Sequence, residues 1–208
     1  MMAGQFITLE GGEGVGKTTN LNFIQELLEA NDISVLVTRE PGGTELAESI
    51  RQLLLDKEQE AISEQTELLM MFAARAQHIK HVIQPALEWG TWVLCDRFTD
   101  ATYAYQGGGR NMDVTAINWL ENFVQGELRP DLTLLLDAPT EIGIKRASHR
   151  GELDRFELEK MEFFERVRHA YLGIAEAQPD RVKVVDASVD LEAVQAQIKS
   201  IISPLLKG

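Results

Sequence analysis

The sequence predicts a three-layer α/β domain built on a five-stranded parallel sheet. Five short runs are apolar almost throughout, which suits strands that are buried on both faces; they span residues 6–9, 34–38, 92–95, 132–136 and 182–185. Segments with apolar residues at helical spacing separate these runs, as the crossover connections of a parallel sheet require. A glycine-rich turn joins the first run to the first helical segment. In such a sheet, ligands collect at the carboxyl ends of the strands.

The glycine-rich turn at residues 11–18 reads GGEGVGKT and fits the pattern G-x-x-x-x-G-K-[ST]. Converging backbone N–H groups and the start of the following helix would bind a polyphosphate. Lys17 would then reach the outer phosphates, and the Thr18 hydroxyl would be a ligand of Mg²⁺. We therefore predict a P-loop NTPase fold that binds a nucleoside triphosphate through Gly11, Gly12, Glu13, Gly14, Val15, Gly16, Lys17, Thr18 and Thr19.

Composition narrows the function classes. The chain has 208 residues, enough for one domain with its own core, and we expect a single domain over residues 1–208. Its formal charge of −13 makes nucleic acid an unfavourable partner. One cysteine, Cys95, excludes an internal disulfide. We find neither a leader-like N-terminal segment nor an apolar run of membrane-spanning length, and expect a cytoplasmic protein without a membrane partner.

The second strand leads into residues 39–44, which read REPGGT. The proline and glycines end the strand, and Thr44 can cap the next helix. One side of that helix is predicted to carry four apolar residues, Leu46, Ile50, Leu53 and Leu54. Arg51 need not lie on this apolar side.

A further helix is predicted from about Ser63, and Arg75 lies on its apolar side with Met71 and Phe72. Burying an arginine without a partner is costly. Its guanidinium therefore either serves a buried site or extends to the edge of the helix, and spacing alone leaves both open.

The third strand ends in Asp96 and Arg97. A carboxylate beside a phosphate loop can hold a magnesium-bound water, and the adjacent arginine can bind a phosphate. A buried structural ion pair is the alternative.

Residues 103–110, YAYQGGGR, combine aromatic and amide groups with three glycines and are predicted to be base-recognising surface rather than core. Asp113 should cap a helix that ends near Gly126. A helix from Pro139–Thr140 carries Arg146, and the polar stretch 149–155 is either a mobile basic flap or an ordinary connection. Two helices, at about 157–177 and 190–202, are expected to be packing elements.

Three motifs follow the loop in order: REPGG at 39–43, DRF at 96–98 and YQGGGR at 105–110. With these, the chain resembles the bacterial thymidylate kinases over nearly its whole length. The resemblance implies one nucleoside monophosphate kinase-like domain with a mobile flap near 146–156. It also implies transfer of the γ-phosphoryl group of ATP to dTMP, giving dTDP and ADP, with Mg²⁺ and in a homodimer.

The resemblance also implies roles for individual residues. Arg97 and Arg51 would hold the dTMP phosphate, Arg75 would hydrogen-bond the thymine edge, and Tyr105 would pack under the deoxyribose and exclude a 2′-hydroxyl. Glu13 would face the sugar. The catalytic candidates are Lys17, Arg97, Arg150 and Glu40, and Arg146 joins the loop residues as a candidate for binding ATP. The candidate metal ligands are Thr18 and Asp96. The candidates for binding dTMP are Glu13, Arg39, Arg51, Met71, Phe72, Arg75, Arg97, Thr102, Tyr105 and Gln106.

The side chain that would cover the thymine is left open. Family members often place a thymine-stacking aromatic residue four positions before the arginine that corresponds to Arg75, where this chain has Met71 and then Phe72. Some family members also carry an arginine in the phosphate loop. This loop contains none, so Arg150 is expected to supply the positive charge instead.

Two other functions use the same loop. A deoxynucleoside kinase would need a carboxylate, for which Glu40 is the candidate, to activate a sugar hydroxyl. The arginines that suit an acceptor phosphate would then be unexplained. A P-loop ATPase that acts by binding partners would need nucleotide-sensitive surface segments, and the sequence shows no motif for them.

Overall fold

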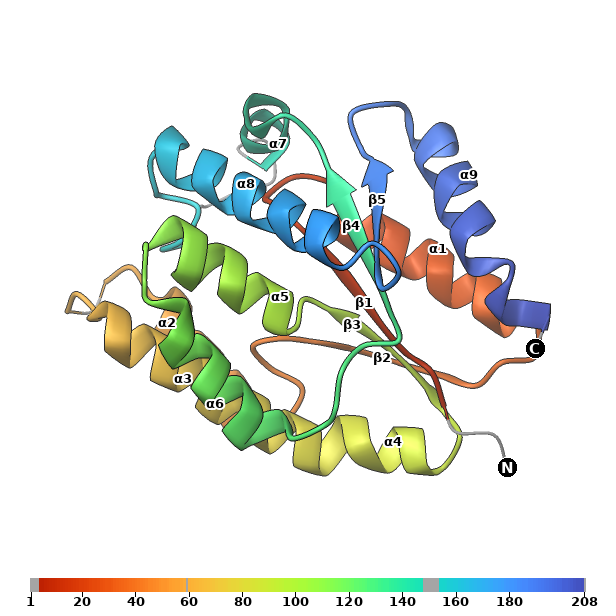
Figure 1. The fold of residues 1–208 in the computed structure, drawn as a ribbon, viewed down its shortest axis with the longest axis horizontal. Helices are drawn as coiled ribbons and strands as arrows, with labels where there is room; N and C mark the ends of the chain where they lie inside the picture. Colours follow the sequence, from red (N-terminus) through yellow and green to blue (C-terminus); the bar gives the residue numbers. More distant parts are fainter. Residues whose placement is uncertain (1–3, 59, 148–153, 208) are drawn as a thin grey trace.

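The computed structural model describes residues 4–58, 60–147 and 154–207, with one central parallel sheet (Figure 1). In this part of the chain, five strands follow the order β2-β3-β1-β4-β5. Their bounds are β1 Phe6–Gly11, β2 Val35–Arg39, β3 Trp92–Asp96, β4 Leu132–Asp137 and β5 Val182–Asp186. The five predicted strands and the parallel α/β fold are confirmed. The strands run one or two residues further toward their carboxyl ends than predicted, to Gly11, Arg39, Asp96, Asp137 and Asp186.

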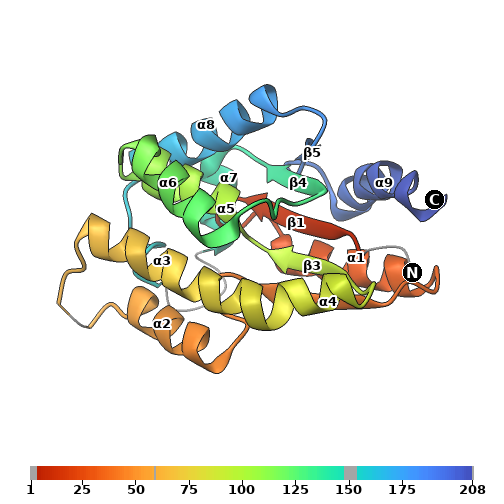
Figure 2. The same ribbon diagram turned by 60° about the horizontal axis from the view of Figure 1, so that its bottom comes forward.

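Helices cover both faces of the sheet and give the three layers (Figures 1 and 2). Ile7 and Leu9 of β1 pack in one core cluster with α1, Lys17–Glu29, and α9, Leu191–Ile202. Phe6 lies on the other face, in a cluster with residues of the π-helical turn η1, Ile79–Ile83. That second face is covered by α4 Gln84–Glu88, α5 Thr99–Thr102 and α8 Met161–Ala177.

The other helices lie around this framework. Two packed helices, α2 Glu45–Leu55 and α3 Glu64–His78, stand outside the sheet, and α3 also packs against α6 Val114–Gln125 (Figure 2). Helix α7, Thr140–Ala147, packs against α8; a π-helical segment, η2 Tyr103–Gly109, follows α5; and a 3₁₀ turn, η3 Leu205–Lys207, follows α9.

Three predicted helix starts are confirmed by side-chain caps. Thr44 Oγ1 accepts a hydrogen bond from the Ala47 N–H over 3.1 Å, and Ser63 Oγ accepts one from the Thr66 N–H over 3.2 Å. The Asp113 carboxylate accepts from the N–H of Thr115 over 2.9 Å at the start of α6.

Two helix predictions need correction. Helix α8 begins at Met161 and not near residue 157, because the Asp154 carboxylate accepts the N–H groups of Phe156 and Glu157 and holds that stretch in turns. In α2, Leu46 and Leu53 are not on the buried side; their exposed fractions are 55% and 51%.

Two of the three glycines of residues 103–110, Gly108 and Gly109, are packed rather than open, so the prediction of open surface is wrong for them. A Cβ added at Gly108 would lie 2.6 Å from Cβ of Ala170, and one at Gly109 would lie 2.4 Å from the Phe163 ring. Only glycine lets η2 approach α8 this closely. Tyr105 and Gln106 are therefore buried against α8 and α3 while still reaching the cavity described below.

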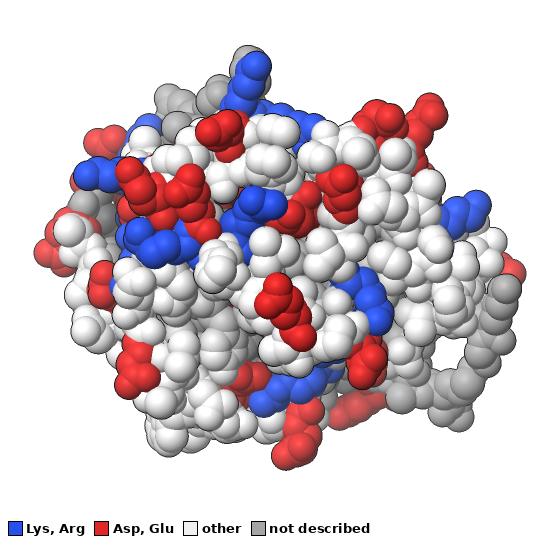
Figure 3. All heavy atoms as spheres, turned by 45° about the horizontal axis from the view of Figure 1, so that its top comes forward, with Lys and Arg blue, Asp and Glu red and all other residues white. Residues whose placement is uncertain are grey.

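The distribution of surface charge and the length of the helices indicate which kinds of partner the protein could bind. On the face shown in Figure 3, basic and acidic side chains are interspersed and form no continuous positive field. Among the helices of the described residues, none combines the length and the apolar character that crossing a membrane requires.

Candidate active site

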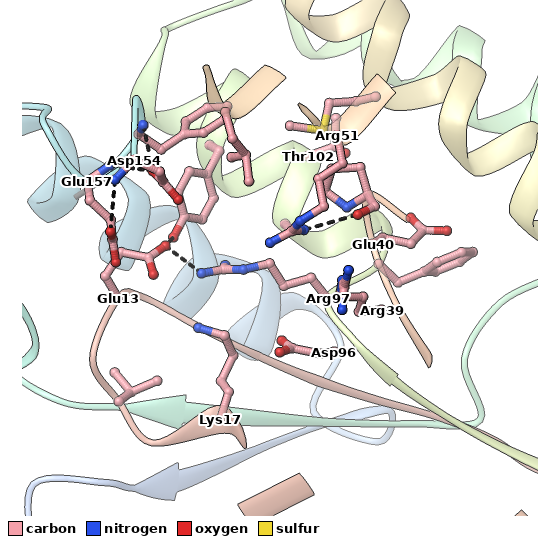
Figure 4. A pocket seen from close by; sticks show the side chains of 18 of the residues that line it. Glu13, Lys17, Arg39, Glu40, Arg51, Asp96, Arg97, Thr102, Asp154 and Glu157 are labelled. Atoms are coloured by element: carbon pink, nitrogen blue, oxygen red, sulfur yellow. Dashed lines mark hydrogen bonds and ion pairs between the residues drawn. The ribbon is translucent and has the colours of Figure 1, made fainter. Parts of the chain in front are cut away.

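One cavity lies at the carboxyl ends of the strands and gathers residues from the glycine-rich loop, the ends of β2 and β3, helices α2, α3 and α5, and η2 (Figure 4). Most of the predicted site residues line it. They are Glu13, Gly14, Val15, Gly16, Lys17, Thr18, Arg39, Glu40, Arg51, Met71, Arg75, Asp96, Arg97, Thr102, Tyr105 and Gln106.

The loop has the backbone that phosphate binding needs. Gly14 and Gly16 have φ angles of 67° and 87°, in the left-handed region that favours glycine. A Cβ on Gly14 would lie 1.9 Å from the carbonyl oxygen of Gly143, so the loop and α7 are in contact through two glycines. The ammonium of Lys17 donates to the carbonyl of Gly12 over 2.7 Å. Burial lowers its pKa, and the nearby positive charge of Arg97 adds to the effect.

The Glu13 side chain is directed toward Arg97 and Tyr105. Its Oε1 accepts hydrogen bonds from Nη2 of Arg97 and from the Tyr105 hydroxyl, both over 2.6 Å, and the Arg97 guanidinium lies 4.8 Å from the centre of the Tyr105 ring (Figure 4). Arg97 therefore pairs with Glu13, which argues against the structural Asp96–Arg97 ion pair considered above. Its φ of 67° is strained for a non-glycine residue, a feature that concentrates at functional sites.

Three arginines stand close together around the cavity. Burial lowers the pKa of Arg51, and the charges of Arg39 and Arg97 lower it further. Arg51 donates to the carbonyl of Pro41 over 3.0 Å, and Arg39 forms a half-exposed ion pair with Glu48. Repulsion among like charges in one partly buried place is relieved by an anion, so this group suits a phosphate.

Arg75 is buried, with an exposed fraction of 3%, so it does not extend to the helix edge. Its Nε donates to Oε2 of Glu40 over 2.6 Å, and Nη2 donates to Thr102 Oγ1 over 3.0 Å. Its Nη1 is buried without a hydrogen-bond partner among the described residues. A buried, unpartnered donor on a cavity wall indicates a ligand acceptor at that position.

Both carboxylate oxygens of Glu40 accept hydrogen bonds. Besides Arg75, Glu40 accepts from Nδ1 of His78 over 3.0 Å, and His78 Nε2 lies 2.7 Å from Thr38 Oγ1. Each oxygen keeps a further lone pair. These contacts orient Arg75, and the catalytic role of Glu40 stays a prediction.

The cavity wall includes Met71 but not Phe72. Phe72 is 2% exposed, packs with Leu68 and Ile117, and lies against Arg75 with 4.8 Å between the guanidinium and the ring centre. Between the two candidates left open by the sequence, the geometry favours Met71 as the side chain beside the ligand.

Asp96 and Thr18 both line the cavity. Oδ1 of Asp96 is buried and has no hydrogen-bond partner among the described residues. An unsatisfied carboxylate oxygen and a hydroxyl at the start of α1 fit the oxygen ligands and bound waters that Mg²⁺ prefers.

Five predicted positions lie elsewhere. Arg146 donates to the carbonyl of Ala187 after β5, over 2.9 Å, and does not line the cavity. Gly12 lines a small neighbouring pocket behind the loop. Gly11, Thr19 and Phe72 are also outside the cavity lining. Arg150 and the central part of the predicted flap, residues 148–153, lie outside the described residues.

Two buried residues beside the cavity, Glu10 and Tyr171, were not identified from the sequence, and Tyr171 accepts a hydrogen bond from Arg97. Glu10, in β1, is fully buried and accepts from the Phe98 N–H over 2.6 Å and from the Tyr171 hydroxyl over 2.7 Å. Burial, together with the nearby charge of Asp100, raises the pKa of Glu10 to about 8. A glutamate inside an apolar strand was a usable signal. Tyr171 gave none, because it lies in a helix that was expected only to pack.

The chain from residue 154 on, at the end of the predicted flap, also contributes to the cavity wall through residues that were not singled out as candidates. They are Asp154, Phe156 and Glu157. Glu67, buried on α3, accepts a hydrogen bond from Gln106 over 2.8 Å. These contacts join segments far apart in sequence, which spacing cannot reveal.

Comparison with known proteins agrees with this geometry. A family model of thymidylate kinases matches residues 9–198. The chain is 57% identical over 207 residues to a thymidylate kinase of Ectopseudomonas mendocina, covering 100% of this chain and 99% of that protein. It is 58% identical over 206 residues to one of Pseudomonas entomophila, covering 99% and 98%. Among solved structures, thymidylate kinase from Ehrlichia chaffeensis is similar, with a TM-score of 0.79, 33% identity and coverage of 97% and 99%. The chain belongs to the thymidylate kinase family.

Proposed function

We propose that this protein transfers the γ-phosphoryl group of ATP to dTMP, giving dTDP and ADP, a step in the synthesis of dTTP. The observation that carries the proposal is the composition of one cavity. A P-loop at one end suits a triphosphate, clustered arginines suit a second phosphate, and the unpartnered Nη1 of Arg75 suits a base acceptor. Only a kinase with a nucleoside monophosphate acceptor uses all three.

The loop and arginines would align the two phosphates. Backbone N–H groups of the loop bind the ATP phosphates, and Lys17 exchanges the carbonyl of Gly12 for a phosphate oxygen. Arg97 and Arg51 hold the acceptor phosphate and neutralise charge during transfer. The oxygens of a phosphate monoester are already largely ionised at neutral pH, so the reaction needs no strong general base. Glu40 would act here by orienting Arg75.

The other half of the cavity would select the nucleoside. Arg75 Nη1 would donate to O4 of thymine, with Thr102 and Gln106 near the base and Met71 against its face. Tyr105 and Glu13, joined by a hydrogen bond, would pack against the deoxyribose and leave no space for a 2′-hydroxyl. The acceptor would therefore be a deoxyribonucleotide.

Magnesium is part of the proposal, held by Thr18 and, through a water, by Asp96. When bound, Mg²⁺ would neutralise charge on the β- and γ-phosphate oxygens. Arg146 is proposed to contribute to ATP binding, and Arg150, on a flap near residues 146–156, to supply the positive charge that the loop lacks.

We further propose a single-domain homodimer in the cytoplasm, where its substrates ATP and dTMP are available. Helix α6 supports the dimer. Trp119 and Phe123 are 64% and 75% exposed, and their rings stack with centres 5.4 Å apart. Adjacent apolar side chains of this size on a surface favour burial against a partner.

A phosphoryl-transfer assay tests the proposal. The purified protein is supplied with ATP, Mg²⁺ and one acceptor at a time: dTMP, dUMP, dCMP or thymidine. We expect rapid formation of dTDP from dTMP and no phosphorylation of thymidine. Phosphorylation of thymidine would instead indicate a deoxynucleoside kinase, and slow ATP hydrolysis with every acceptor would indicate an ATPase that acts on partners.

A further inference from the structure

Gln106 and Glu67 form a buried hydrogen bond at the edge of the cavity. Nε2 of Gln106 donates to Oε1 of Glu67 over 2.8 Å, and each residue is only 1% exposed. Gln106 lines the cavity, whereas Glu67 stands behind it on α3. Glu67 therefore influences a ligand only through its neighbour.

A carboxylate determines which end of a neighbouring amide faces it. A glutamine side chain alone can rotate by half a turn and present either its NH₂ group or its oxygen. An ionised carboxylate only accepts hydrogen bonds, so Gln106 must present Nε2 to it. Oε1 is then left for another partner, and it accepts no hydrogen bond from the described residues.

Two arginines hold the Glu67 carboxylate in place. Nη2 of Arg155 donates to Oε2 of Glu67 over 2.6 Å, and Nη2 of Arg110 lies 3.3 Å from the same oxygen. Nε of Arg155 is itself bound to the carbonyl of Leu54 over 2.8 Å. With these donors at Oε2, the Glu67 carboxylate is fixed as the acceptor for Nε2 of Gln106.

We propose that Glu67 is a positioning residue for base selection: it fixes the Gln106 amide so that Oε1 is presented to the N3–H group of the pyrimidine. This inference rests on the proposed function. Thymine and uracil carry a donor at N3 and an acceptor at O4, whereas cytosine has an acceptor at N3 and an amino group at C4. The fixed acceptor of Gln106 and the free donor Nη1 of Arg75 therefore match dTMP at both positions and oppose dCMP at both.

The Glu67→Gln substitution tests this role. With an amide at position 67, Gln106 can turn and present Nε2 to N3 of cytosine. We expect the ratio of kcat/KM for dTMP to that for dCMP to fall by about tenfold, since an acceptor buried against another acceptor costs about that much. The matched control is Glu159→Gln, because Glu159 also pairs with Arg110 but lies outside the cavity lining. It should leave the ratio unchanged.

A purely structural role for Glu67 would lower activity on both nucleotides and preserve the ratio. A second comparison uses Gln106→Leu as the background, in which Glu67→Gln should cause no further fall in the ratio. If Glu67→Gln alone does not fold, the charge-balanced pair Glu67→Gln with Arg110→Gln is compared with Arg110→Gln alone, and the pair should show the lower ratio.

Three outcomes would overturn the inference. One is an unchanged ratio in the folded Glu67→Gln protein or in the charge-balanced pair. Another is an equal fall in the ratio when Gln106 is already leucine. A wild-type protein that does not phosphorylate dTMP would overturn the proposed function and this inference together, whereas an active wild type with an unchanged ratio would overturn the inference alone.

Discussion

Nε of Arg75 donates to the Glu40 carboxylate over 2.6 Å, and neither side chain is more than 4% exposed. The pairing offsets the cost of burying a guanidinium and fixes its plane. His78 holds the other oxygen of Glu40. Arg75 is thereby fixed with one donor, Nη1, left for a ligand.

The first prediction concerns base choice. Replacing Arg75 with Ala should reduce the preference for dTMP over dCMP, mainly by weakening dTMP. A donor that faces the amino group of cytosine is left unpaired, at a cost of about 1–3 kcal/mol, and the variant removes that penalty together with the bond to O4. kcat/KM for dTMP and dCMP is measured on both proteins. Arg51→Ala is the control, because it affects the phosphate that both nucleotides share. Unchanged discrimination in Arg75→Ala would show that Arg75 does not contact the base.

A related expectation concerns dUMP on the wild-type protein. It keeps O4 and lacks only the 5-methyl group, whose burial contributes about 0.8 kcal/mol. It should bind several-fold more weakly than dTMP and still react.

The second prediction concerns the phosphates. Lys17→Ala and Arg97→Ala should each lower kcat by about a hundredfold or more, because each removes a positive group that offsets charge in the transition state. Thermal unfolding is measured in parallel, to separate loss of chemistry from loss of fold. Near-wild-type turnover by either folded variant would contradict its proposed role.

The sequence was informative where a local pattern has one structural meaning. Continuous apolar runs predicted all five strands, and because parallel strands end at one edge, Lys17, Arg39 and Asp96 were expected in the same place, where the structure puts them. Asp113 and Ser63 marked helix starts because a side-chain cap is a local interaction.

Contacts between side chains that are far apart in the sequence could not be predicted from such local patterns. Tyr171 donates to Glu10 across 161 positions in the chain, and no spacing rule joins them. The engagement of Glu40 was hidden for the same reason, since both its partners come from α3. Gly108 was taken for open surface, because a glycine run signals flexibility and close packing equally well.

The third prediction uses that glycine run. Gly108→Ala should lower the free energy of unfolding by about 1–3 kcal/mol, since its Cβ would overlap Cβ of Ala170 on α8. Gly107→Ala is the matched control. Its nearest neighbour would be the Ile117 side chain at 3.4 Å, so it should be close to neutral. Urea unfolding of both variants gives the comparison, and equal stabilities would mean that η2 does not need glycine against α8.

The fourth prediction concerns assembly. If α6 forms part of the proposed dimer interface, replacing exposed Trp119 and Phe123 with Glu and Lys should convert dimer to monomer without unfolding the chain. Sedimentation of the double variant and the wild type measures this. The control is Trp89→Lys, at the end of α4, where the side chain is 80% exposed. This change should leave the oligomeric state as it is in the wild type. A wild type that sediments as a monomer would refute the homodimer.

The last prediction concerns pH and the buried Glu10. Burial raises the pKa of Glu10 in the folded protein from 4.5 to about 8. Between these values, the folded protein retains a proton that the unfolded chain releases. The contribution of Glu10 to the free energy of unfolding is therefore fully present below about pH 4.5 and is lost as the pH rises through about 8.

Glu10→Gln removes this titration and keeps an oxygen that can accept from the Phe98 N–H. The difference in Tm between Glu10→Gln and the wild type should therefore shift in favour of the variant as the pH increases from 5 to 8. Other groups titrate in both proteins alike and cancel in this difference. Glu176→Gln, at an exposed position on α8, should show a constant difference from the wild type over the same range. A difference between Glu10→Gln and the wild type that stays constant from pH 5 to 8 would mean that Glu10 is ionised in the folded protein throughout. The Tyr171 hydroxyl and the Phe98 N–H would then be sufficient to stabilise a buried charge.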